Sequence, residues 1–99
     1  MAEAHEIQRH PPFTTYVPER EMLVTTTTDE HDTITTIFRG HESELHRGVG
    51  GPYLVVLRTA AGPVPQIVQA AQEQHEEIVQ AVREGREDEY RRAHGFPRA

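Results

Sequence analysis

The sequence predicts an α+β fold, in which a three-stranded antiparallel sheet is followed by one long C-terminal helix. Two threonine-rich segments, at about 21–28 and 33–39, flank a short polar stretch that is typical of a turn. A third segment, at about 53–59, is the most apolar part of the chain, and an amphipathic stripe continues over about 64–94. This order of patterns indicates strands first and a helix last.

The two threonine-rich segments predict a hairpin. Both are dominated by β-branched residues, which favour pleated, half-buried strands, and the DEHD stretch between them fits a four-residue loop. Cross-strand threonine pairs stabilise a hydrated sheet face. We therefore expect Thr25, Thr27, Thr33 and Thr35 to share one solvated face.

The third predicted strand shows no alternation of apolar and polar residues. Its apolar run is continuous from Tyr53 to Leu57, which is typical of a strand covered on both faces. One helix covers only one face of a sheet. We therefore expect a second copy of the chain or another protein to cover the other face.

The C-terminal stripe predicts a helix that is too long for the domain. Apolar side chains recur at three- and four-residue spacing from Val64 to Val82, and His75 lies among them. A helix of about 30 residues would span about 45 Å, whereas a compact chain of this size has a radius of gyration of only about 13 Å. We therefore expect the helix to break or to overhang the domain after Gly85.

The other segments complete the domain organisation. Residues 1–20 contain Pro11, Pro12 and Pro18 among polar residues, which predicts an extended arm. Such an arm either frays or lies across a neighbouring subunit or sheet edge. Residues 21–95 are predicted to form a single α+β domain, and residues 96–99 a tail.

Composition limits the classes of function. Apolar residues make up 35% of the chain and Cys is absent, so a small core would be reinforced by a metal or a second subunit rather than by a disulfide. The net charge of −6 argues against a surface for duplex nucleic acid. No apolar run approaches the roughly 20 residues that span a bilayer. We expect a cytoplasmic protein with no membrane contact, or a virion component if it is a phage protein.

Seven histidines raise the question of a metal site. The closest pattern is His41 to His46, but on a helix this i,i+5 spacing turns the two rings about 140° apart. Zinc needs three or four convergent ligands, so solvated loop histidines are the simpler interpretation and no cofactor is expected. The alternative is zinc or another divalent metal held by His31, His41 and His46.

The sequence carries no catalytic motif that stands out. Ser43 is the sole serine, Cys and Lys are absent, and no nucleophile elbow surrounds Ser43. The glycines at 48–51 precede a strand, whereas phosphate-binding loops precede a helix. The sequence favours a non-catalytic protein and leaves an enzyme open.

These features favour a self-associating assembly or protein-interaction module, acting as a homo-oligomer or with another protein. One version is a bacteriophage structural or accessory protein from a GC-rich host, since the chain has Arg but no Lys. The alternatives are a small oligomeric ligand- or metal-binding protein or enzyme, with an interface site of His and Glu, and a regulator that acts by protein–protein contact. The expected interaction residues lie on the arm, the last strand and the helix stripe, and are Phe13, Tyr16, Val17, Tyr53, Val55, Val68, Ala71, His75, Ile78 and Val82.

Overall fold

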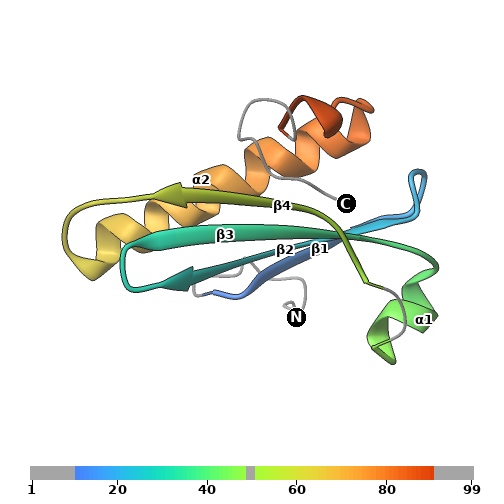
Figure 1. Cartoon of the computed structure of the whole chain (residues 1–99), viewed down its shortest axis with the longest axis horizontal. Coiled ribbons are helices and arrows are strands. Elements are labelled where there is room, and N and C mark those ends of the chain that lie inside the picture. The colour runs from blue at the N-terminus through green and yellow to red at the C-terminus, as the bar shows by residue number, and fades with distance from the viewer. Residues whose placement is uncertain (1–10, 49–50, 91–99) are drawn as a thin grey trace, which may run out of the picture.

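In the computed structural model, an antiparallel sheet of four strands carries a long helix on one face (Figure 1). The structure describes residues 11–48 and 51–90. The strands are β1 (Phe13–Val17), β2 (Met22–Asp29), β3 (Asp32–Arg39) and β4 (Pro52–Thr59), and the helices are α1 (Glu42–His46) and α2 (Val64–Arg83). The strands neighbour one another in sequence order. The predicted α+β class, with an antiparallel sheet and a long helix, is confirmed.

The predicted number of strands is wrong, because residues 13–17 form an additional strand. Phe13 lies opposite Thr26 and Val17 opposite Met22 in the β1–β2 register. The prolines around this segment do not prevent pairing, since an edge strand needs ladder hydrogen bonds on one side only. Phe13 and Val17 are both buried, so burial of these side chains favours the strand over a free arm. Residues 1–10 of the predicted arm lie outside the described residues.

A tight turn sets the register of the central hairpin. Asp29 is paired with Asp32, so the loop contains only Glu30 and His31 and is shorter than the predicted DEHD loop. Glu30 has a left-handed conformation with φ 56°, as two-residue hairpin turns require. The three predicted strands otherwise agree with β2, β3 and β4 to within one residue at each end.

Helix α2 ends at Arg83, earlier than the predicted limit near residue 94, because Gly85 terminates it. Gly85 has φ 76°, a conformation that glycine adopts without strain. Its N–H donates to the carbonyl of Val82 at 3.1 Å, and the N–H of Arg86 donates to the carbonyl of Ala81 at 2.8 Å. This pair of bonds is a Schellman motif, which satisfies carbonyls at a helix end. Residues 91–99, which include the predicted tail, lie outside the described residues.

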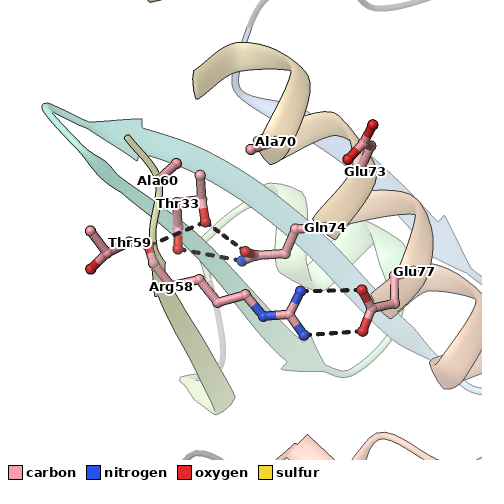
Figure 2. A pocket seen from close by; sticks show the side chains of 8 residues that line it. All are labelled: Thr33, Arg58, Thr59, Ala60, Ala70, Glu73, Gln74 and Glu77. Atoms are coloured by element: carbon pink, nitrogen blue, oxygen red, sulfur yellow. Dashed lines mark hydrogen bonds and ion pairs between the residues drawn. The ribbon is translucent and has the colours of Figure 1, made fainter. Parts of the chain in front are cut away.

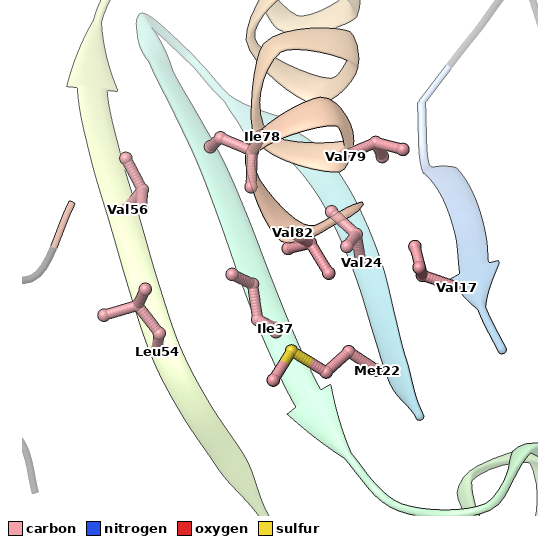
Figure 3. Packing of buried hydrophobic residues seen from close by; sticks show 9 residues of the cluster. All are labelled: Val17, Met22, Val24, Ile37, Leu54, Val56, Ile78, Val79 and Val82. Carbon is pink, nitrogen blue, oxygen red and sulfur yellow. The ribbon is translucent and has the colours of Figure 1, made fainter. Parts of the chain in front are cut away.

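The core lies between α2 and the sheet (Figure 3). Alternate residues of each strand point toward α2, and the helix turns its apolar stripe toward them. The clustered aliphatic residues come from all four strands and from the C-terminal half of α2, and are Val17, Met22, Val24, Ile37, Leu54, Val56, Ile78, Val79 and Val82. Within residues 11–48 and 51–90, no helix is long and apolar enough to cross a membrane.

Candidate functional site

A row of polar side chains lies beneath α2, beside the aliphatic core. Thr26, Thr33 and Thr35 of the sheet and Gln74 and His75 of α2 are all buried. Gln74 Nε2 donates to Thr35 Oγ1 at 2.9 Å, the hydroxyls of Thr35 and Thr26 are 2.7 Å apart, and Thr26 Oγ1 lies 2.9 Å from His75 Nδ1. At the other end, Thr33 donates to Gln74 Oε1 at 2.6 Å. The five side chains therefore form one connected network.

The predicted threonine face is wrong, because the threonines are divided between the two faces. Thr26 lies opposite Thr35, whereas Thr25 lies opposite Thr36. Thr35 and Thr33 point toward α2, where Gln74 and the neighbouring hydroxyls satisfy them. Buried hydroxyls are tolerated when they are hydrogen-bonded, which is why this half of the threonines lies under the helix.

His75 lies between two threonine hydroxyls. The Gln74 amide nitrogen can only donate, so the Thr35 hydroxyl accepts from it, whereas either hydroxyl of the Thr35–Thr26 pair can be the donor. The two ring nitrogens of His75 lie 2.9 Å from Thr26 Oγ1 and 2.9 Å from Thr15 Oγ1, so in the neutral ring one nitrogen donates and the other accepts. Burial lowers the pKa of His75 from 6.5 to about 4. His75 is thus a neutral, buried structural residue rather than an accessible base.

A shallow hollow of about 200 Å³ opens between the end of β4 and α2 (Figure 2). On its rim, the Arg58 guanidinium donates two hydrogen bonds to the Glu77 carboxylate, at 3.1 and 3.0 Å. Tyr90 also donates to Glu77, and burial, followed by this bond, raises the pKa of Tyr90 to about 12. The Arg58–Glu77 pair therefore joins β4 to α2, and Glu73, the other charged residue that lines the hollow, accepts a hydrogen bond from Gln69. The charged groups of the hollow are thus engaged with protein groups rather than directed at a ligand.

The histidines of the predicted metal site are separated in the fold. His31 lies in the β2–β3 turn, whereas His41 follows β3 and precedes α1. The eight residues of β3 separate them, a span of about 25 Å at 3.3 Å per residue. His46 ends α1, and its side chain lies outside the described part of the structure. In residues 11–48 and 51–90, no group of three or more His, Asp or Glu side chains could hold a metal ion.

The sheet face opposite α2 is the principal candidate for a functional surface. We call it the open face, and its central residues form three rows across the strands. These rows are Tyr16, Leu23 and Phe38; Thr14, Thr25, Thr36 and Val55; and Thr27, Ile34 and Leu57. Leu57 is 39% exposed, and most of the others are only partly buried.

The central rows of the open face carry no charge. Every residue in them is aliphatic, aromatic or hydroxyl-bearing, in a chain whose net charge is −6. Acidic residues lie at one end of the face, where Asp29 of β2 lies opposite Asp32 of β3 in the strand register. Helix α1 lies at the opposite end, where the Tyr16 hydroxyl donates to the carbonyl of Gly40 at 2.8 Å. A face without charge, bounded by charge, is typical of a protein contact.

The structure divides the predicted interaction residues between the core and the surface. Tyr16 and Val55 lie on the open face. Tyr53 and Val68 are partly buried, and Tyr53 donates to Asp88 at 2.9 Å. The other six pack inside the single chain and are Phe13, Val17, Ala71, His75, Ile78 and Val82.

Sequence reasoning missed several central residues of the open face, including Leu23, Ile34, Phe38 and Leu57. Both faces of β2, β3 and β4 carry apolar or hydroxyl side chains, so the members of the open face become readable only once the pairing register is known. Comparison of this chain with protein-family models, with curated proteins and with solved structures finds no match. The candidate site therefore depends on geometry alone.

Proposed function

We propose that this protein is a non-catalytic self-association module, in which two copies pack their open faces together. The observation that carries the proposal is the continuous uncharged surface formed by the central rows of β1 to β4. Two copies of an acidic chain approach most favourably where neither presents a charge. Sheets also pack face to face readily, with interdigitating side chains about 10 Å apart.

The size of the open face suits a specific contact. Four strands about 4.8 Å apart and about seven residues long cover roughly 450–500 Å² per copy, or about 1,000 Å² for a pair. This total is at the lower limit for a biological interface, which is about 1,000 Å². We therefore expect association at micromolar rather than nanomolar concentrations.

The open face also suits a two-fold arrangement. A two-fold contact uses the same patch on both copies, so the patch must complement itself. The central row combines threonine hydroxyls, which both donate and accept hydrogen bonds, with Val55 at its end. Leu57 and Ile34 supply apolar area on one side of this row, and Leu23 and Phe38 on the other.

The test is a charge placed at the centre of the open face. Thr36 lies on β3, flanked by Thr25 and Val55, and the Thr36→Glu variant would bury two carboxylates at the contact. Since desolvation of an unpaired charge is costly, we expect the dissociation constant to rise by roughly tenfold or more. Sedimentation velocity over a concentration series measures this constant.

The matched control is Val64→Glu, which adds the same charge elsewhere. Val64 is the first residue of α2 and is 70% exposed, and an acidic residue is well tolerated in a first helical turn. We expect this variant to associate as the wild type does, within about twofold. A wild-type chain that remains monomeric up to its solubility limit, or equal effects of the two variants, would contradict the proposal.

A further inference from the structure

The two edge strands of the sheet, β1 and β4, differ in their protection. β1 has five residues, with Pro12 directly before it and Pro18 directly after it. β4 has eight residues, and none from Pro52 to Leu57 is charged. Short strands, prolines and charges are the usual guards against strand addition. β4 is therefore the edge that is open to a further strand.

Backbone hydrogen bonds determine which groups of β4 point outward. The N–H of Ala60 donates to the carbonyl of His31 at 2.6 Å, so this position of the β3–β4 ladder is a hydrogen-bonded pair. Such pairs alternate along an antiparallel ladder. Val56 therefore bonds to β3, whereas Val55 and Leu57 direct their N–H and C=O groups away from the sheet.

Helix α2 leaves this backbone edge uncovered. It packs over β1, β2 and β3, and in Figure 3 β4 runs to one side of it. Leu54 and Val56 of β4 join the core under α2. The other contacts of β4 with the C-terminal part of the chain are made by side chains, as in the Arg58–Glu77 pair at 3.0 Å and the Tyr53–Asp88 bond at 2.9 Å. A strand added beside β4 would thus extend the sheet without displacing the helix.

We infer that β4 is a second self-association surface, which pairs antiparallel with β4 of another copy about a two-fold axis at Val55. In this register Val55 lies opposite its own equivalent on the open face, and Leu54 lies opposite Val56 on the side of α2. Tyr53 lies at the register irregularity of the β3–β4 ladder, and its side chain packs against the core rather than on the open face. Directly opposed residues of an antiparallel pair share a face and stabilise it when both are apolar. The pairing is therefore apolar on both faces.

Charge also favours a second copy as the occupant of this edge. In the same register Arg58 lies opposite Pro52, so no two like charges are opposed. Shifting the axis to Val56 would place the charged Arg58 opposite the apolar Leu54. The β4 edge is thus self-complementary in one register, as a two-fold contact requires.

The inferred edge contact goes beyond the proposed face-to-face contact and does not depend on it. The outward groups of β4 lie at the rim of the sheet, whereas Thr36 lies on an inner strand. A copy joined through one surface keeps the other surface free. The two contacts together would therefore allow assembly to grow past a dimer.

Amide hydrogen exchange of the wild-type chain tests the edge contact. The amides of Val55 and Leu57 should exchange about as fast as exposed amides in dilute solution, and roughly tenfold slower or more at concentrations where sedimentation detects larger species. The amide of Val56, bonded within the sheet, is the internal reference. An exchange rate at Val55 that does not change with concentration would overturn the inference. It would mean that no second copy pairs with β4, either because the edge stays empty or because another part of the same chain covers it.

A pair of variants at Leu57 isolates the outward N–H group. Leu57→Pro removes that N–H at an edge, where proline is tolerated, and Leu57→Thr removes the same side chain but keeps the N–H. We expect the concentration-dependent protection of the Val55 amide to be lost in the proline variant and retained in the threonine variant, whatever the size of the assembly. Equal protection in the two variants would overturn the inference. If the proline variant fails to fold, the exchange of Val55 in the wild type decides the question.

The Thr36→Glu variant separates the two proposals. Loss of the face-to-face contact should leave the concentration-dependent protection of Val55 and Leu57 intact, since the outward groups of β4 are unchanged. If the Thr36→Glu variant loses this protection as well as the face-to-face contact, the claim that the edge contact is independent is wrong.

Discussion

Lowering the pH from 6.5 to 4 should cost the folded chain about 3 kcal/mol through His75 alone. Burial lowers the pKa of His75 to about 4, from 6.5 in the unfolded chain. The folded state therefore binds the proton less readily than the unfolded state does. The stabilisation is complete above pH 6.5, is lost progressively as the pH falls toward 4, and does not change further below that value.

The network explains why protonation is costly. In the neutral ring one nitrogen accepts a hydrogen bond from a threonine hydroxyl, so a proton on that nitrogen would force the hydroxyl to reverse its bond. The groups that bond to the ring are the hydroxyls of Thr15 and Thr26, with Phe13 at 6.0 Å between ring centres. None of these three carries a charge that could stabilise the imidazolium.

Urea unfolding at a series of pH values measures this effect, on a sample dilute enough to be monomeric. His75→Gln is the control, because it removes the titrating group, and its stability should change little between pH 6.5 and 5. Glu84, whose pKa is lowered by bonds from Gln80 and then Arg86, contributes only at lower pH. Equal pH dependence of the wild type and the His75→Gln variant would show that His75 is not the cause.

Thr35→Val should destabilise the fold by about 2–3 kcal/mol, because it breaks the network at its centre. Valine has nearly the shape of threonine, so packing is preserved while the hydroxyl is lost. Gln74 Nε2 loses the acceptor that now lies at 2.9 Å, and Thr26 loses its hydroxyl partner at 2.7 Å. Both groups would remain buried with fewer partners.

The adjacent residue provides the control for this substitution. Thr36→Val makes the same chemical change on the open face, where the hydroxyl is outside the network. We expect its effect on unfolding of the monomer to be within about 0.5 kcal/mol. Equal effects of the two substitutions would mean that the network under α2 does not stabilise the protein.

The sequence was sufficient to predict the elements with strong local signals. β-branched residues identified β2 and β3, and the apolar run identified β4. The sequence offered Gly85 as a position where the helix could break or beyond which it could overhang, and α2 ends two residues before it, at Arg83. The sequence did not decide whether the helix breaks near Gly85 or overhangs the domain. That choice depends on the Schellman hydrogen bonds, which form only in the geometry of the last helical turn.

The strand β1 was missed because its local signal is weak. Pro12 and Pro18 enclose only five strand residues, and a short segment between prolines resembles an extended arm. Pairing with β2 and burial of Phe13 and Val17 decide its structure. These are tertiary effects, which outweigh local propensity.

The buried network was missed because threonines at 25–28 and 33–36 occupy both faces of the hairpin. A threonine run gives no alternation, so it does not indicate which members are buried. The available signal was on the helix, where Gln74 and His75 lie within the buried stripe. Polar residues in such a stripe require partners, and Thr26, Thr33 and Thr35 were the candidates.

The central proposal is that two copies meet through their open faces, and isotope-filtered NOE spectroscopy of the wild-type protein tests it most directly. A sample that mixes labelled and unlabelled chains reports contacts between copies only. We expect such contacts among the methyl groups of Leu23, Ile34, Val55 and Leu57, together with the ring of Phe38. Intermolecular contacts confined to α2 and the β4 edge, or their complete absence in a sample that sediments as a dimer, would contradict the proposal.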